Sequence, residues 1–210
     1  MPHKAQAEII TIVLISGIVI SLVGVAYMWG IPLISKSTAL TEFLSAEDFV
    51  VKLNDRIVNI ANSGSGEATL NIPKGRIRVI DFDRDDPRNP DKNSLVLETT
   101  VSQPLVLGNS VILKTNVLGE NATYGEAEPR VINLSSESAG SDYKLLFTLH
   151  FRELDTRNQP SKGYLIAVQE GTVTGNSQVT VSYAGTEIIP GESAGGLGDL
   201  VVTKIRVDIV

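Results

Sequence analysis

The chain has 210 residues, of which 42% are hydrophobic, and this is enough for one globular domain with an appendage. Its formal net charge is −6, and its 18 Lys and Arg residues are scattered without a basic stripe, so nucleic acid is not expected as a partner. Cysteine is absent from the sequence, which excludes a disulfide framework and a thiolate metal site.

The first predicted element is a long apolar helix over residues 9–34, a segment without any charged side chain. About 26 residues at a rise of about 1.5 Å give a helix of about 39 Å, longer than the ~30 Å hydrocarbon core of a bilayer. Tyr27 and Trp29 lie toward its end, where amphipathic rings favour the headgroup level, and Gly30 with Pro32 predicts a kink or a break. The segment can therefore span a membrane.

Three small residues of this segment, Gly17, Ser21 and Gly24, fall three or four positions apart and so share one face of the helix. Such a stripe lets a second helix approach closely. Two simpler interpretations of the segment stay open. One is a signal anchor that holds a soluble domain to the membrane. The other is a secretory signal that is cleaved after Ala26, just before Tyr27.

An acidic residue, Glu8, stands at the start of the apolar run. A carboxylate that is carried into hydrocarbon without a partner is strongly unfavourable. A leader that ends at Ala5 would leave a new α-amino group on Gln6, two residues ahead of Glu8. If identical helices stack with an axial offset, the amine of one copy can meet the carboxylate of its neighbour, and this pair sets the register of the stack.

Residues 1–34 resemble an archaeal type IV pilin-like precursor with a class III signal peptide. In that family a very short basic leader ends in a small residue, a glutamine often opens the mature chain, and an acidic residue follows shortly before the apolar helix. Here Lys4, Ala5, Gln6 and Glu8 occupy those places. The commonest leaders of the family end in Lys-Gly or Arg-Gly instead of Lys-Ala, and the opening typical of archaellins is missing, which disfavours a motility filament.

The resemblance implies a structural protein and no enzyme: a subunit of an extracellular type IV pilus-like filament on the cell surface. Its expected partners are copies of itself in a helical homopolymer, a prepilin peptidase, the pilus assembly machinery, and the membrane that holds the precursor before assembly. No cofactor is expected. The alternative is a membrane-anchored extracellular β-sandwich binding domain that does not polymerise.

Beyond Pro32, apolar residues recur at helical spacing among Ser, Thr and Glu, and this pattern predicts an amphipathic continuation of the helix to about Asp48. We therefore expect a leader at 1–5, a helix at 6–48 and a β-rich extracellular head at 49–210. The fold class is α+β, with a long N-terminal hydrophobic helix followed by a mainly antiparallel β-sandwich or barrel.

The head sequence alternates apolar and polar residues with a period of two, which is typical of half-buried antiparallel strands. Gly108-Asn109 predicts a tight hairpin between strands at 94–107 and 110–118, and Pro104 predicts that the first of these is broken or lies at an edge. Charged residues on the last strand are typical of edge protection. Further strands are expected near 56–62, 67–72, 76–82, 129–134, 145–151, 164–169, 179–183 and 201–209.

Residues 191–195 match the Gly-x-Ser-x-Gly nucleophile motif, with Ser193 at its centre. A hydrolase of this type needs a helix after the serine and a histidine later in the chain. The only histidines, His3 and His150, precede it, and a strand pattern follows. A Gly-rich loop is therefore favoured over a secreted hydrolase.

The densest acidic patch lies at residues 81–94, where Asp81, Asp83, Asp85 and Asp91 could together supply oxygens to Ca²⁺. The helix-loop-helix calcium pattern is not met, and basic residues partly neutralise the loop, so a solvated turn is favoured and no metal is expected. Asn121 and Asn133 begin sugar-acceptor sequons, which are meaningful only if the domain lies outside the cell.

Overall fold

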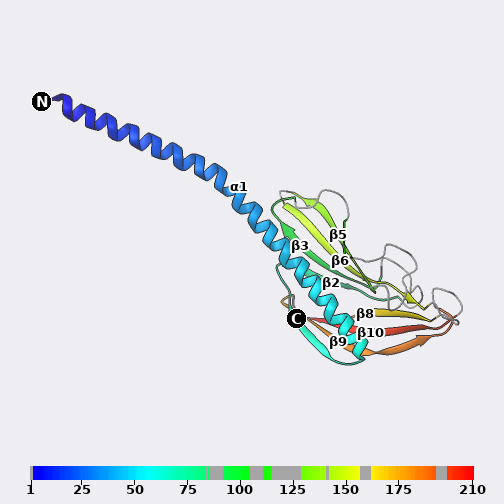
Figure 1. Ribbon diagram of the computed structural model, residues 1–210. Helices are drawn as coiled ribbons and strands as arrows, with labels where there is room; N and C mark the ends of the chain where they lie inside the picture. Colours follow the sequence, from blue (N-terminus) through cyan, green and yellow to red (C-terminus); the bar gives the residue numbers. More distant parts are fainter. Residues whose placement is uncertain are drawn as a thin grey trace.

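The computed structural model describes residues 2–83, 85, 92–104, 111–114, 129–140, 142–156, 162–192 and 198–210. Within these residues the chain forms one long helix followed by ten strands in two sheets (Figure 1). The sheets are mostly antiparallel, so the predicted α+β class is confirmed.

Helix α1 spans Pro2–Ser63, and it is continuous through Pro32. Of the kink or break predicted at Gly30 and Pro32, the break is therefore wrong, and Figure 1 shows one continuous, gently curved helix. The helix ends at a glycine: Gly64 has a φ of 64°, and its N–H donates to the carbonyl of Ile60 over 3.1 Å. A glycine in this left-handed conformation is the usual residue after a helix C-terminus, because it has no Cβ to clash.

The predicted end of the helix at residue 48 is wrong, as is the strand expected near 56–62, because α1 continues through both. The buried side chains of this stretch follow the helical period of three or four residues, which a two-residue alternation cannot produce. They are the polar Asn54 and the apolar Ala39, Ala46, Phe49, Val50, Leu53, Ile57 and Ile60. One face of the helix therefore stays largely apolar for about six turns, from Ala39 to Ile60.

The two sheets have five strands each. In spatial order, the first sheet contains β1 (Glu67–Asn71), β9 (Gln178–Ile189), β10 (Leu200–Ile209), β8 (Gly163–Val173) and β7 (Leu154–Asp155). The second contains β2 (Arg76–Ile80), β3 (Ser94–Val101), β6 (Asp142–Phe151), β5 (Arg130–Ala139) and β4 (Val111–Lys114). The parallel pairing of β8 with β10 is the exception to the antiparallel arrangement of the described strands.

Most of the strands expected outside the helix are confirmed, but three details differ. The last strand, β10, lies between β8 and β9 and is not an edge. Strand β3 ends at Val101, before Pro104, which agrees with the predicted break; the other alternative, an edge position, is wrong, because β3 lies between β2 and β6. The turn residues Gly108 and Asn109 lie outside the described residues, and the strand after them, β4, pairs with β5 and not with β3.

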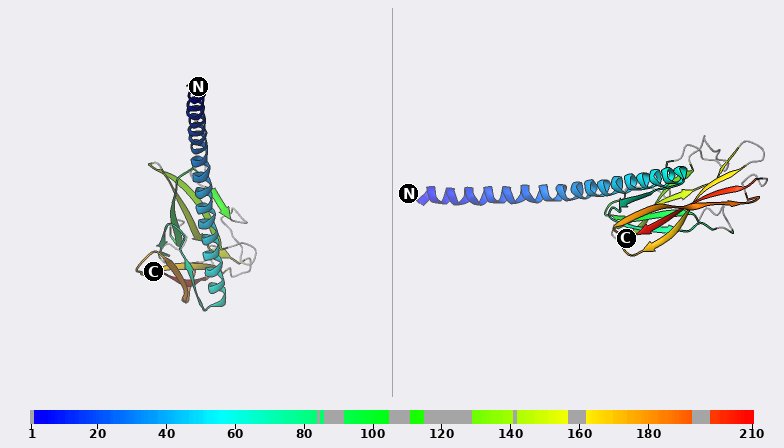
Figure 2. Two further views of the ribbon diagram at one scale, coloured as in Figure 1. Left: turned by 90° about the vertical axis from the view of Figure 1, so that its left-hand side faces the viewer. Right: turned by 90° about the horizontal axis from the view of Figure 1, so that it is seen from below.

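The second half of α1 completes the core of the head, because its apolar face packs against both sheets. Leu53 and Ile57 are fully buried there, and the ring of Phe43 lies 5.7 Å from the ring of Phe147 in β6. Figure 2 shows this half lying along the sheets while the first half leaves the head. The head domain therefore begins inside the helix, well before residue 49.

A buried asparagine, Asn93, also joins the two sheets directly to each other. Asn93 has a φ of 54°, and its amide nitrogen donates to the carbonyls of Phe151 (3.1 Å) and Ile166 (2.8 Å). Its side-chain oxygen accepts the N–H of Val168 over 2.8 Å. One side chain therefore forms hydrogen bonds with backbone groups of β6 in one sheet and of β8 in the other. These bonds offset the unfavourable burial of its polar amide.

Candidate functional site

The first half of α1 is the most unusual surface of the described chain, because it is apolar and exposed on all sides. Sixteen large hydrophobic side chains between Ile12 and Ile34 are each 48% to 77% exposed. Figure 1 shows that this part of the helix touches no other element. Monomeric soluble proteins do not normally expose a continuous apolar surface of this extent. We call Thr11–Ile34 the exposed rod.

The exposed rod has the length and composition of a membrane-spanning helix. Among the described residues, α1 is the one helix that is long and apolar enough to cross a membrane, and its most apolar stretch has a mean hydropathy of 2.3. Its roughly 24 residues extend over about 36 Å, which exceeds the ~30 Å hydrocarbon core of a bilayer. Tyr27 and Trp29 are 70% and 77% exposed near the end that faces the head, where a membrane interface would lie. The rod is therefore suited to insertion in a membrane.

The small residues predicted for helix contact lie on the exposed rod. A Cβ added to Gly17 or Gly24 would meet nothing within 4 Å, so neither glycine is required by the packing of the chain itself. The hydroxyl of Ser21 donates to the carbonyl of Gly17 over 2.8 Å, so its polar group is satisfied within the helix. Gly17 and Ser21 belong to a shallow, mostly apolar groove on the rod, which is also lined by Val13, Leu14, Ile18, Leu22 and Val25.

The residues predicted for processing and register lie at the start of α1. Lys4, Ala5, Gln6 and Glu8 have helical backbone, and their side chains are outside the described part of the chain. The cut between Ala5 and Gln6 therefore stays a prediction.

At its other end the exposed rod joins a segment that is firmly held by the head. Lys74 Nζ lies 2.8 Å from Glu42 Oε1, and Arg130 Nη1 lies 2.8 Å from Asp55 Oδ1. Both ion pairs connect the helix to the strand region, and Ala39 between them and the rod is fully buried. The direction in which the rod leaves the head is therefore fixed by packing.

The acidic candidates for calcium have other contacts. Asp81 Oδ1 accepts the N–H of Glu170 over 2.6 Å, and Asp83 Oδ1 accepts the N–H of Asp85 over 3.1 Å. Asp91 lies outside the described residues. In the described part of the chain, no three His, Asp or Glu side chains come together in a way that could hold a metal ion.

The remaining candidates from the sequence are the serine nucleophile, the two glycosylation sites and His150. Ser193 and Asn121 lie outside the described residues. Asn133 is half-buried on β5, between β4 and β6. The ring nitrogen Nδ1 of His150 lies 3.1 Å from Ser94 Oγ and 3.1 Å from the carbonyl of Lys92, so this histidine belongs to the contact between β3 and β6.

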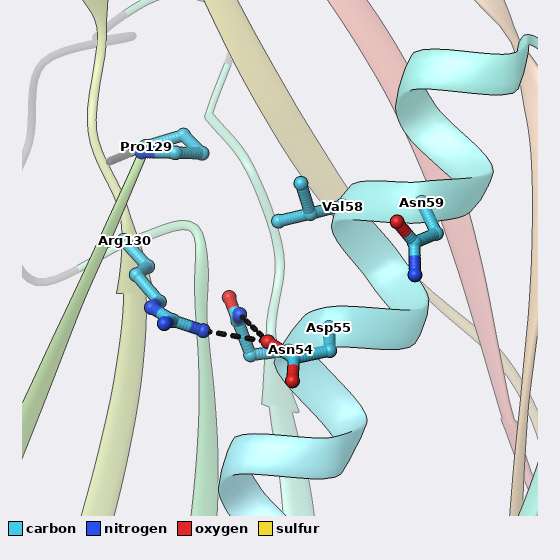
Figure 3. A pocket seen from close by; sticks show the side chains of 6 residues that line it. All are labelled: Asn54, Asp55, Val58, Asn59, Pro129 and Arg130. Carbon is cyan, nitrogen blue, oxygen red and sulfur yellow. Dashed lines mark hydrogen bonds and ion pairs between the residues drawn. The ribbon is translucent and has the colours of Figure 1, made fainter. Parts of the chain in front are cut away.

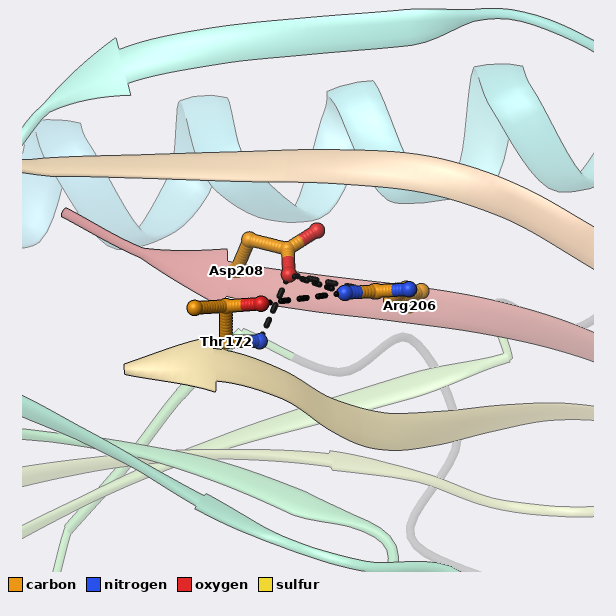
Figure 4. A network of polar contacts seen from close by, with 3 residues as sticks. All are labelled: Thr172, Arg206 and Asp208. Atoms are coloured by element: carbon orange, nitrogen blue, oxygen red, sulfur yellow. Dashed lines mark hydrogen bonds and ion pairs between the residues drawn. The ribbon is translucent and has the colours of Figure 1, made fainter. Parts of the chain in front are cut away.

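One polar network was not anticipated from the sequence (Figure 4). Asp208 Oδ1 accepts the N–H of Thr172 over 2.6 Å and two N–H groups of Arg206 over 3.0 and 2.9 Å. The backbone hydrogen bond from Thr172, helped by Arg206, lowers the pKa of Asp208 below its usual 3.8. The network links β8 to β10 at the surface.

Comparisons of the chain with protein-family models, with curated proteins and with solved structures found no match. The functional assignment therefore depends on the geometry. That geometry is a β-rich head carried on a long helix, whose first half is exposed, apolar and suited to membrane insertion.

Proposed function

We propose that the chain is the structural subunit of an extracellular, archaeal type IV pilus-like filament, in which the exposed rods pack together and the heads face outward. The observation that carries this proposal is the contrast within α1: the rod is exposed all round, while one face of the same helix is buried in the head from Ala39 onward. A rod that is held rigidly and in a fixed direction is suited to regular stacking.

The energy for assembly comes from the apolar surface of the rod. Full burial of a large apolar side chain contributes about 1.5–3 kcal/mol relative to water, before the entropy of association is subtracted. Within a bilayer these side chains are already out of water, so association there depends on close packing. The groove at Gly17 and Ser21 supports this step, because it lets a neighbouring rod approach the backbone.

Processing and register complete the proposal. A prepilin peptidase would cut after Ala5, next to Lys4, and the new amine on Gln6 would pair with Glu8 of an adjacent copy as the pilus assembly machinery withdraws the rod from the membrane. We expect Glu8→Ala to leave the head folded and to reduce the number of filaments. Normal filament numbers in this variant, counted by electron microscopy, would argue against the register role.

The mature N-terminus is the first test. We expect N-terminal sequencing of the protein from its native cells to begin at Gln6. A chain that begins at Met1 would indicate a signal anchor, and a chain that begins at Tyr27 would indicate a secreted domain. Either result would overturn the proposal.

The contact face of the rod provides the second test. We expect the double substitution Gly17→Leu, Gly24→Leu to reduce filament assembly at least tenfold, because both side chains would fill the face needed by a neighbour. The same substitutions raise helix propensity by about 1 kcal/mol each, so they do not weaken the rod itself. Ala26→Leu is the matched control, because at about 100° per residue it lies on the face opposite Gly17.

We expect Ala26→Leu to assemble normally. An anchored domain that does not polymerise would insert in the membrane equally well with either change, and filaments would be absent throughout. Filaments that tolerate both glycine substitutions would contradict the proposed contact face. Membrane insertion of each variant, measured by fractionation, shows that the proteins being compared reach the same compartment.

A further inference from the structure

Two leucines of α1 are exposed at the level of the head, on a side of the helix that the sheets do not cover. Leu40 and Leu44 are 49% and 53% exposed, whereas Ala39 and Ala46 are 0% and 1% exposed. Leu40 and Leu44 are one helical turn apart, so they share one side of α1. Packing on the head therefore does not account for these two side chains.

Lipid does not account for them either. A membrane interface would lie near Trp29, and Leu40 and Leu44 follow Trp29 by 11 and 15 residues. These separations correspond to about 16.5 and 22.5 Å along the helix. The polar headgroup layer extends only about 5–8 Å beyond the hydrocarbon on each side. In a membrane-inserted chain both leucines would therefore face water unless a protein covers them.

The two leucines continue a regular pattern of large apolar residues that begins in the exposed rod. Its members are separated by seven, four, seven and four residues, and each is 49% to 77% exposed. They are Leu22, Trp29, Leu33, Leu40 and Leu44, and we call them the outer stripe. Eleven residues make about three helical turns, so all five share one side of α1. The pattern matches itself when it is moved by eleven residues.

Two charged residues beside the outer stripe have the same spacing. Lys36 is exposed and Glu47 is half-buried, and they are eleven residues apart, so they lie on one line along α1. Neither has an ion-pair partner among the described residues, whereas Glu42 in the same segment is paired with Lys74. A second helix displaced by eleven residues, about 16.5 Å, would bring its Lys36 beside Glu47 of the first.

The outer stripe ends after Leu44, where the exposed side of α1 becomes charged. Asp48 pairs with Lys52 over 2.6 Å, and Asp55 pairs with Arg130 of β5 over 2.8 Å. Figure 3 shows Arg130 reaching Asp55 from the strand. These carboxylates already have partners within the chain. The apolar surface that α1 offers to a second molecule therefore stops at Leu44.

We propose that the outer stripe binds the outer stripe of a second copy of the chain, displaced by eleven residues along the helix. Leu40 and Leu44 of one copy then lie level with Trp29 and Leu33 of the other. The partner is a second copy because the apolar spacing and the two charges complement themselves at the same displacement. This contact rests on the proposed function and deepens it: with the heads facing outward, the outer stripe faces the filament axis.

The contact is compatible with the other features of the rod. At this displacement Ala26 comes level with Ser37, whose small side chain leaves room, so the variant Ala26→Leu can still assemble. A subunit of a helical homopolymer has several neighbours at different displacements, so the contact at Glu8 involves another neighbour. The new contact therefore adds to the one at Glu8 and does not replace it.

Cysteine cross-linking in filaments tests the displacement, because the sequence contains no other cysteine. We expect Leu33→Cys, Leu44→Cys, oxidised with copper phenanthroline, to give a ladder of covalent oligomers on a non-reducing gel, since the two thiols of adjacent copies are level. Each single variant should stay largely monomeric. The matched control is Leu33→Cys, Leu40→Cys, whose positions also belong to the outer stripe but are only about 10.5 Å apart along the helix. It should form no ladder.

Electron microscopy of the same samples separates two kinds of failure. Filaments in which the Leu33→Cys, Leu44→Cys pair does not cross-link, or in which the control pair cross-links equally well, would overturn the outer-stripe contact and leave the proposed function standing. The absence of filaments from the unmodified chain would overturn the proposed function, and the contact with it.

Charge reversal provides a second test that leaves the leucines unchanged. We expect Lys36→Glu and Glu47→Lys each to reduce filament numbers at least fivefold, because like charges would meet at every subunit. The two substitutions together should restore at least half of the filaments. Arg56→Glu is the matched control, because it makes the same change of charge at an exposed position of α1 outside the outer stripe. It should assemble normally.

The double variant decides the result. Filament numbers that are no higher in the double variant than in the single variants would refute the pairing of Lys36 with Glu47. An equal loss in Arg56→Glu would refute it as well, because the effect would then follow the net charge of the chain.

Discussion

The two halves of helix α1 share one continuous backbone, yet their surroundings are opposite. Ile20 in the exposed rod is 71% exposed, whereas Ile57 in the second half is fully buried. The second half has one apolar face, which packs on the sheets, while the rod is apolar all round. The comparison shows that packing on the head accounts for only the second half, and that the rod has the apolar surface of a membrane-spanning helix.

The largest expected effect is on stability, and it tests the difference between the two halves of α1. Leu53→Ala should lower the free energy of unfolding of the head by about 2–5 kcal/mol, because it leaves a cavity in the shared core. Leu22→Ala, the matched change in the rod, should leave it unchanged, since Leu22 is 63% exposed. Urea unfolding followed by circular dichroism of the strands measures both. Equal losses in the two variants would contradict the division of α1.

A smaller effect concerns the head alone. Asn93→Ala should cost about 2–3 kcal/mol of unfolding free energy, because it leaves the buried N–H of Val168 and two carbonyls without their partner. Asn62→Ala, on the exposed side of α1, is the control and should change stability little. Hydrogen exchange at Val168 should increase in the first variant and not in the second. Unchanged exchange would refute the bridging role.

The smallest effect concerns the surface network around Asp208. Its folded pKa is lowered, so its contribution to stability is present above about pH 3.8 and is lost as the pH falls through the folded pKa. Asp208→Asn should therefore reduce stability at pH 7 by less than about 1 kcal/mol, because solvent screens the pair. The difference from the unmodified chain should shrink as the pH falls below 3.8 and through the lowered pKa of the folded chain. A difference that does not shrink would contradict this electrostatic origin.

The single tryptophan allows the rod and the head to be followed separately, because Trp29 belongs to the rod and not to the head. Its fluorescence therefore reports the environment of the rod, while circular dichroism of the strands reports the fold of the head. We expect urea to unfold the head without the same transition in Trp29 emission when the rod is held in detergent.

Local patterns in the sequence predicted much of this fold, because burial repeats over short distances. The sequence predicted the apolar helix, the strand at Leu145–Phe151 and the α+β class. The sequence also indicates that the helix continues past residue 48, because apolar residues recur at three- and four-residue spacing from Ala46 to Ile60. A short run of apolar residues near 56–62 fits either period, and the two-residue interpretation was wrong.

Long-range contacts could not be predicted in this way. Asn93 meets backbone groups 58 and 73 residues away, and Arg130 meets a carboxylate 75 residues earlier. Neither pair has a local pattern that would identify it. The strand after Gly108-Asn109 has a typical hairpin signal, yet β4 pairs with β5 because β3 is already bordered by β2 and β6.

The most direct test of the central claim is electron microscopy of the purified full-length mature chain as detergent is removed in the absence of lipid. We expect regular filaments, since the exposed rod has no other way to leave water. Chains that stay monomeric, or that collapse into irregular aggregates under all conditions, would contradict the claim that the rod is built to pack against copies of itself.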